Sequence, residues 1–330
     1  MDGRVLVMQS RNKPQVAVFM VTYNQAKYIE QSIEGVLMQQ TDFPFKVFIG
    51  DDCSTDGTRD ICLRYKEKYP DKIELILQEK NLGSVANTRS VFPYCFAYGD
   101  YTAMCEGDDY WTDPLKLQKQ IDFLEANPDF AICFHRVAIH FEDGSRETQY
   151  SNPDQQSVTT FDDLARDNFI YTLSTVFRNG LFEKFPDWSH AMMSGDWILH
   201  LLNAERGKIK FLEDTMAVYR VHKGGAWSMK HTKDQMDYMA ELVEKFHNHF
   251  YPKGEKGFKT FASYLLTELC YTAFEEGSYT EGKAYCKRAV SVSDYLSLRK
   301  KISLRVRYFL CSFPALAEFY KGILKSIKRA

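Results

Sequence analysis

The sequence predicts an α/β fold with a doubly wound, mostly parallel sheet, helices on both faces and a helical C-terminal region. Short apolar runs rich in β-branched residues alternate with segments whose apolar residues have helical spacing, as in successive βαβ units. The chain has 330 residues, which is enough for a large core and a smaller second unit. Beyond about residue 235 only helical patterns remain.

The N-terminal elements follow one another in a regular cycle. The first apolar run, VAVFMV at 16–21, predicts a strand buried on both faces of the sheet. Helical spacing of Ile29, Ile33, Val36 and Leu37 predicts the next helix, which ends near residue 40. The cycle then repeats, with strands predicted at 45–50, 73–77 and 101–105 and helices at about 56–69 and 84–98.

After residue 110 the pattern continues with a helix, a strand and a turn. Asp113 as N-cap and Pro114 at the first helical position predict a helix over 113–126. The apolar run at 131–141 predicts a further strand, and Asp143-Gly144 after it predicts a hairpin turn. These elements extend the sheet beyond the first βαβ units.

Composition excludes several classes of protein. Hydrophobic residues make up 45% and charged residues 26%, and a formal charge of −2 gives no general attraction for nucleic acid. Eight cysteines form no CxxC pair, and several lie in apolar runs where a thiol packs as a small hydrophobe, which predicts a reducing, cytoplasmic compartment. No secretory leader is recognisable, and no run approaches the roughly 18 apolar residues that a membrane helix needs.

Polar residues directly follow three predicted strands, where a doubly wound sheet binds its ligands. They are Thr22, Tyr23 and Asn24, then Asp51 and Asp52, then Glu106, Asp108 and Asp109. Adjacent carboxylates repel each other, so Asp51 and Asp52 need a donor or a cation nearby. A sugar hydroxyl or a base N–H is a natural partner for Asp52, whereas helix capping is enough to explain residues 54–58.

The cluster Glu106-Gly107-Asp108-Asp109 predicts a site for a divalent cation and a diphosphate. Mg²⁺ and Mn²⁺ prefer oxygen ligands and bind through one or two carboxylates together with substrate phosphates. A solvated acidic turn is the alternative. Four tryptophans near these motifs, which either stack on sugar rings or pack in the core, are Trp111, Trp188, Trp197 and Trp227.

Two further candidate residues lie near 200 and 220. Asp196 precedes a helical run and either caps that helix or takes a proton from a hydroxyl as a general base. His222 follows a strand-like segment, beside cations and glycines that allow close approach to phosphate. It is either a ligand to a metal or diphosphate, or a surface histidine.

The C-terminal third predicts helices and a basic tail. Residues 265–290 have the pattern of a helical hairpin. The tail 299–330 carries nine Lys or Arg against one acid, Glu318, with aromatic and aliphatic residues interleaved. We expect either peripheral contact with an anionic membrane, on the inner face of the plasma membrane, or a helix packed on the protein.

Taken together, six segments resemble the motif series of family 2 glycosyltransferases in order and spacing. They are VTYNQAKYIEQSIEGVLMQQ, DDCSTDGT, NLGSVANTR, EGDDYWTDPLKLQKQ, SGDWILHL and YRVHKGG. One acidic pair alone is a weak signal, but six motifs in register, over roughly residues 14–225, are specific. The resemblance implies a GT-A fold, an inverting mechanism and a nucleotide diphosphate bound through Mn²⁺ or Mg²⁺, in an enzyme of the bacterial cell-surface glycan type.

The resemblance also implies roles for the residues that bind the nucleotide-sugar. Thr22, Tyr23 and Asn24 match the segment that lines the nucleobase pocket. Asp52 matches the contact to ribose or base, and Arg89 is expected to contact the nucleotide. The nucleotide-sugar set is completed by Asp51, Glu106 and Asp108.

The metal ligands and the base are implied in the same way. Asp108 and Asp109 match the metal acids, His222 matches a late histidine near metal and diphosphate, and Asp196 matches the general base. One departure is Glu106, which stands where the family has the first aspartate of DxDD. Its longer side chain leaves open which acid of 106–109 ligates the metal.

The implied reaction transfers a sugar from a nucleotide diphosphate-sugar, UDP being the first expectation, to a saccharide or lipid-linked saccharide, in surface polysaccharide or other glycan synthesis. We expect a catalytic domain over 1–234, with the donor bound mainly by 14–115 and the acceptor side and base within 145–230. The helical region spans 235–330. The alternatives are a noncatalytic nucleotide-sugar or glycan-binding protein, and a sugar nucleotidyltransferase, which needs a glycine-rich basic loop near the N-terminus.

Overall fold

The computed structural model describes residues 13–191, 195–225, 232–292, 294 and 296–329. These residues form two compact units: one reaches residue 159 and includes 169–222, and the other combines 160–168 with the chain from 223 onward. Trp227 and the first residue of the motif SGDWILHL lie outside the described residues.

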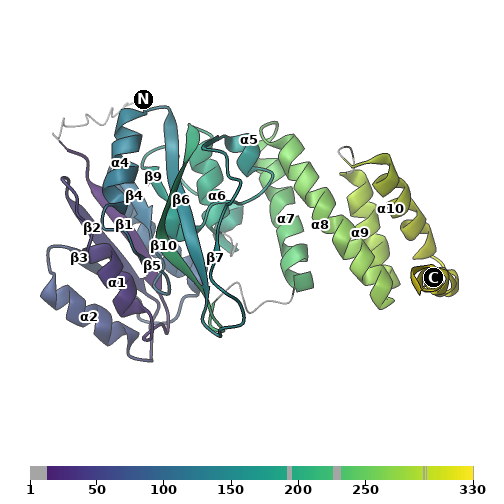
Figure 1. Cartoon of the computed structure of the whole chain (residues 1–330), viewed down its shortest axis with the longest axis horizontal. Helices are drawn as coiled ribbons and strands as arrows, with labels where there is room; N and C mark the ends of the chain where they lie inside the picture. The colour runs from purple at the N-terminus through teal and green to yellow at the C-terminus, as the bar shows by residue number, and fades with distance from the viewer. Residues whose placement is uncertain (1–12, 192–194, 226–231, 293, 295, 330) are drawn as a thin grey trace. The chain divides into compact units, whose positions relative to one another are not determined.

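A mixed sheet of ten strands forms the centre of the first unit (Figure 1), in the order β3-β2-β1-β4-β9-β6-β10-β5 with β7 and β8 at its margins. One half is parallel and consists of β1 (Val16–Thr22), β2 (Phe45–Asp51), β3 (Ile73–Leu77) and β4 (Tyr101–Met104). The other half has β6 (Phe130–Phe141) parallel to β10 (Lys208–Val221). Antiparallel pairing adds β5 (Tyr110–Trp111), β7 (Gln149–Tyr150), β8 (Val158–Thr159) and β9 (Val176–Arg178). The predicted α/β sheet is confirmed.

Helices cover both faces of the sheet because side chains alternate along each strand. Val16, Val18 and Met20 of β1 share a core with α1 (Ile29–Leu37), α2 (Thr58–Lys68) and α4 (Lys116–Ala126). On the other face Phe19 stacks on Phe92 of α3 (Ser84–Tyr98), with 4.6 Å between ring centroids. Shorter elements are η1 (Thr172–Ser174), η2 (Asp187–Ala191) and α6 (Gly195–Ala204).

Two local predictions in this unit have different outcomes. The helix expected from residue 113 begins at Lys116, because the Asp113 carboxylate accepts a hydrogen bond from the Leu115 N–H at 2.8 Å in a turn before the helix. The turn expected at Asp143-Gly144 is confirmed, since Gly144 has a φ of 67° and follows β6 into its pairing with β7.

The second unit is helical, as predicted. It contains α5 (Phe161–Leu164), α7 (Thr232–Phe250), α8 (Glu255–Glu276), α9 (Tyr279–Ser291), α10 (Leu298–Leu310) and α11 (Pro314–Arg329). Helices α8 and α9 form the predicted hairpin, and Gly277 between them has a φ of 82°. Among the helices of the described residues, none has the length and apolarity to cross a membrane.

The expectation of unpaired thiols is wrong for two cysteines of this hairpin. Cys270 of α8 and Cys286 of α9 are joined by an S–S bond of 2.02 Å. The other six cysteines are free thiols, and all of them except Cys53 are buried. Cysteine usage therefore no longer supports the predicted reducing compartment.

Candidate active site

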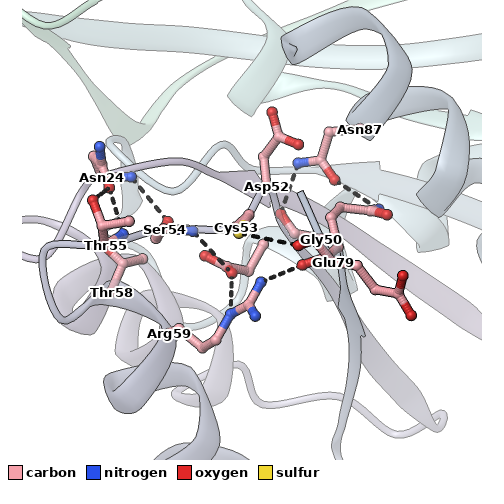
Figure 2. A network of polar contacts seen from close by, with 12 residues as sticks. Asn24, Gly50, Asp52, Cys53, Ser54, Thr55, Thr58, Arg59, Glu79 and Asn87 are labelled. Atoms are coloured by element: carbon pink, nitrogen blue, oxygen red, sulfur yellow. Dashed lines mark hydrogen bonds and ion pairs between the residues drawn. The ribbon is translucent and has the colours of Figure 1, made fainter. Parts of the chain in front are cut away.

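The loop after β1 is fastened to the loop after β2 (Figure 2). Asn24, with a φ of 52°, donates from its N–H to the Ser54 hydroxyl at 3.0 Å, and its side-chain oxygen accepts from the Thr55 N–H at 2.8 Å. Thr22 is buried and donates to the Gln25 side chain at 2.7 Å. Tyr23 is 45% exposed and presents its ring beyond the strand end. Of the predicted nucleobase segment, Tyr23 and Asn24 are therefore exposed, and Thr22 supports the loop.

The predicted acid pair after β2 has internal partners. Asp51 is fully buried and accepts from Arg59 Nε at 2.6 Å, so it holds α2 against β2. Asp52 is 2% exposed, and its two oxygens accept from the N–H groups of Leu82 at 2.7 Å and Gly83 at 2.9 Å. The chain thus supplies donors to both oxygens of Asp52 and to one oxygen of Asp51, whose Oδ1 is buried without a hydrogen-bond partner among the described residues. The predicted contacts of these two residues to a nucleotide-sugar remain predictions.

The acid loop, residues 105–110, sits tightly on the end of β1. Gly107 donates to the Val21 carbonyl at 2.9 Å and accepts from the Ser32 hydroxyl at 2.9 Å. A Cβ at Gly107 would lie 2.8 Å from the Thr22 Cβ, so glycine is required for this close approach. The segment that follows β1 and the acid loop are thereby held together.

Arg220 of β10 clamps the acid loop from the other side. Its backbone N–H donates to Asp109 Oδ1 at 2.8 Å, and its guanidinium donates to the Asp108 carbonyl at 2.5 Å and to the Gln31 side chain. The guanidinium also lies 4.2 Å from the ring centroid of Tyr110. This buried cation balances part of the negative charge of the loop.

Asp108 contacts His222 at this end of the sheet, and the charge of Asp196 acts on the neighbouring Glu106 carboxyl. Asp108 Oδ2 lies 3.1 Å from His222 Nε2, and the His222 ring packs beside Tyr28 with 4.7 Å between centroids. Burial raises the pKa of the Glu106 carboxyl, and the negative charges of Asp108 and Asp196 raise it further. Residues about 90 positions apart in the sequence are thus near enough to interact electrostatically.

The predicted metal ligands are brought together in part. Asp108 and His222 offer an oxygen and a nitrogen donor in contact with each other. Asp109 instead is 1% exposed and turned toward Arg220, while its Oδ2 has no hydrogen-bond partner. Across the described ranges, no three His, Cys, Asp or Glu side chains are gathered as a ready metal site. The donor set fits Mg²⁺ or Mn²⁺ only if a bound substrate or water completes the coordination.

Burial raises the pKa of Asp109 well above its ordinary value, as do the neighbouring Asp108 and Glu106 charges. Negative charge is therefore crowded on one short loop, and a divalent cation would relieve the repulsion. This electrostatic crowding is the observation that supports a cation at the loop.

Arg89 has partners within the chain, and two of the four tryptophans pack in the core. Arg89 of α3 donates to the Ser189 hydroxyl of η2 at 2.8 Å and lies over the Phe185 ring. Trp111 is 1% exposed and Trp197 is fully buried. These two tryptophans belong to the core and are excluded as stacking surfaces for sugar rings.

Lys116 and Arg220 are the polar residues of this region that the sequence analysis missed. Lys116 is fully buried, with Nζ 3.9 Å from the Trp111 ring centroid and 2.8 Å from Gln120 Oε1. Gln120 in turn donates to the Cys133 and Ser174 carbonyls at 2.8 and 2.9 Å. A lysine on the apolar face of a predicted helix was the available signal for Lys116, and the run Tyr-Arg-Val-His was the signal for Arg220.

Comparisons with known proteins agree with this geometry. The model of a family described as Glycosyl transferase family 2 matches residues 17–221. An uncharacterised protein of Mycobacterium tuberculosis is 40% identical over 217 residues, which cover 66% of this chain and 62% of that protein. TuaG of Bacillus subtilis, named as a teichuronic acid biosynthesis glycosyltransferase, is 32% identical over 164 residues, covering 50% of this chain and 62% of TuaG.

Two solved structures share the fold over most of the chain. The structure of S. aureus TarS 1–349 in complex with UDP-GlcNAc superposes with a TM-score of 0.62 and 18% identity, covering 93% of this chain and 92% of that one. The mannosyltransferase PcManGT from Pyrobaculum calidifontis, in complex with GDP-Man and Mn²⁺, gives a TM-score of 0.55 and 17% identity, covering 93% and 86%. At these identities the likeness concerns the fold alone.

Proposed function

Because the chain belongs to glycosyl transferase family 2, we propose that it transfers a sugar from a nucleotide diphosphate-sugar to a hydroxyl acceptor, with inversion at the anomeric carbon. The observation that carries this proposal is the contact of Asp108 with His222 on the acid loop, where the charges of Asp108 and Asp196 also raise the pKa of Glu106. The fold is the GT-A type, and ligands of open α/β sheets bind at this edge. The aligned part covers only 62% of the mycobacterial relative, so the activity is proposed for this chain.

The donor nucleotide is proposed to lie against the loop after β1. Tyr23 offers an exposed ring to the base, and Asn24 holds that loop in place through Ser54 and Thr55. Asp52 contributes by anchoring the Leu82–Gly83 backbone beside the end of β2. We take UDP as the first donor class to test, because TarS is seen with UDP-GlcNAc, and GDP as the second, because PcManGT is seen with GDP-Man.

We assign the diphosphate and a divalent cation to Asp108 and His222. Mn²⁺ or Mg²⁺ would neutralise the diphosphate charge as the bond to the sugar breaks. Asp108 would offer an oxygen ligand and His222 a nitrogen ligand, as their contact at 3.1 Å allows. Asp109 and Arg220 hold the loop that carries Asp108.

Asp196 is proposed as the general base. Its carboxylate takes the proton from the acceptor hydroxyl, whose oxygen attacks the anomeric carbon on the face opposite the diphosphate. The bond between sugar and diphosphate breaks, the nucleoside diphosphate leaves with the bonding electrons, and the configuration inverts. The acceptor is proposed to be a saccharide or a lipid-linked saccharide, in surface polysaccharide synthesis, the process for which TuaG is named.

The decisive test is calorimetric binding of UDP, GDP and dTDP to the full chain, each with and without Mn²⁺. We expect one nucleotide to bind in a metal-dependent way, and this binding to be lost in Asp108→Ala. The control is Asp122→Ala, which removes an exposed carboxylate of α4 that contacts Gln118 and should bind normally. Absence of binding for all three nucleotides would contradict the donor site.

Product analysis separates the proposed function from its alternatives. A transferase releases a nucleoside diphosphate from the activated donor only when an acceptor or water accepts the sugar. A noncatalytic binding protein releases none, and a nucleotidyltransferase releases pyrophosphate from a nucleoside triphosphate and a sugar phosphate. Either of the last two results would replace the proposed reaction.

A further inference from the structure

Helix α10 has an apolar stripe on its exposed face. The stripe consists of large side chains that are 40 to 73% exposed, namely Leu298, Ile302, Val306 and Phe309. Spacings of four, four and three residues place them on one side of the helix. The opposite side packs inside the second unit through the buried Leu304 and Leu310. A contiguous exposed apolar row of this kind marks an interaction surface.

The stripe continues past the end of the helix. Phe309 and Phe313 are in contact, with ring centroids 5.0 Å apart, and Phe313 is itself 51% exposed. In the first turns of α11, Leu316 is 44% exposed and Phe319 68% exposed. The apolar side chains thus extend over two successive helices in the second unit.

Cations of α10 border its stripe. At 100° per residue, Arg299 lies along one edge of the stripe, and Lys301 and Arg305 lie along the other. Between Tyr295 and Ala317 the sequence contains no Asp or Glu. Arg307, in contrast, is turned inward, 3.9 Å from the Tyr271 ring centroid. The surface therefore combines apolar side chains with net positive charge.

We propose that the stripe of α10 and its bordering cations dock on the surface of an anionic lipid bilayer, with the helix lying in the plane of the interface. Acyl chains would receive the apolar side chains, and lipid phosphates would meet Arg299, Lys301 and Arg305. A second copy of the chain fits less well, because a two-fold contact would face cations with cations and supply no acid. This docking does not depend on the proposed transfer reaction.

The apolar contribution is tested by flotation of the full chain with phosphatidylcholine vesicles that contain or lack phosphatidylglycerol. We expect flotation only with the anionic vesicles, and a loss on the order of tenfold or more in Ile302→Ser/Phe309→Ser. The control Tyr251→Ser/Tyr264→Ser removes two exposed rings, 63% and 52% exposed, from elsewhere in the second unit. It should float like the wild type. Equal flotation of both double variants would overturn the proposal.

The charge contribution is tested with a second pair of variants. Arg299→Gln/Arg305→Gln should bind anionic vesicles about 30-fold more weakly, since each basic residue near the surface contributes about 1 kcal/mol. Lys256→Gln/Lys287→Gln removes two exposed cations from α8 and α9 and should change binding little. Flotation that is equal on neutral and anionic vesicles would contradict the role of charge.

Oligomeric state is the remaining outcome to measure. Light scattering should give the same oligomeric state for the wild type and for Ile302→Ser/Phe309→Ser. If the wild type fails to float and forms a dimer that this variant dissociates, the stripe is an interface between copies and lipid docking is wrong. Because none of these readouts uses sugar transfer, failure of the docking proposal and failure of the proposed function are distinguishable.

Discussion

Lys116, the buried cation beneath the acid loop, is expected to make the stability of the first unit depend on pH. Burial lowers its pKa from 10.5 to about 7. At a pH between these two pKa values, Lys116 is largely protonated in the unfolded chain and largely neutral in the folded chain. The free energy of unfolding therefore rises with pH above about 7, and this gain disappears as the pH falls back to about 7.

The size of the effect follows from the pKa difference. Each pH unit within the window changes the free energy of unfolding by about 1.4 kcal/mol at most. Because titration is half complete near pH 7, the gain between about pH 7 and about 8.5 should be about 1.5 kcal/mol. Buried thiols such as Cys62 and Cys133, with pKa values raised to about 12, act in the opposite direction at higher pH. The comparison must therefore be made between variants.

The assay is urea unfolding followed by tryptophan fluorescence, to which the buried Trp111 and Trp197 of the first unit contribute. Lys116→Met should lack the gain of about 1.5 kcal/mol that the wild type shows. Lys119→Met is the control on the same helix, because Asp113 and Asp214 raise the pKa of Lys119 and keep it charged in this range. Equal pH dependence in all three proteins would refute the reasoning.

Three further predictions concern the site. Asp196→Asn should lower kcat about 10²- to 10⁴-fold with unchanged donor affinity in calorimetry, because the general base is lost; normal turnover would exclude that role. Arg220→Met should lower the free energy of unfolding in urea by about 3 to 5 kcal/mol. The control Arg64→Met, at an exposed arginine, should lower it by about 1 kcal/mol or less. Similar losses in the two variants would show that Arg220 does not hold the acid loop. Gly107→Ala places a methyl group 2.8 Å from the Thr22 Cβ and should lower the free energy of unfolding in urea by about 1 to 3 kcal/mol. An unchanged urea midpoint would contradict the close approach of Gly107 to Thr22.

Much of the fold follows from local sequence pattern. Residues 16–21 of β1 are all apolar because both faces of the strand are covered, and a continuous run of this kind predicts a central strand. The helical spacing of Ile29, Ile33 and Val36 is confirmed by their full burial. The acid loop was predicted at a strand end because the carboxyl ends of parallel strands share one edge of a sheet.

Partners of polar groups could not be predicted from sequence. The neighbours of Asp51 and Asp52 in sequence reveal no donor, yet Arg59 donates to one oxygen of Asp51 and the Leu82–Gly83 backbone donates to both oxygens of Asp52. Arg220 is more than 100 residues from the loop it clamps. Hydrogen bonds between distant segments depend on how the strands pair, which no local pattern encodes.

The sequence by itself determined the α/β class, the helical C-terminal region, the six motifs and the residue types available for chemistry, since these follow from periodicity and from the order of residues along the chain. The tertiary structure decided which of those residues meet. In the folded chain Asp109 accepts a hydrogen bond from the Arg220 N–H, and Asp108 contacts His222. The negative charge of Asp196 raises the pKa of Glu106. Burial and strand pairing set these distances, and both are properties of the packed chain as a whole.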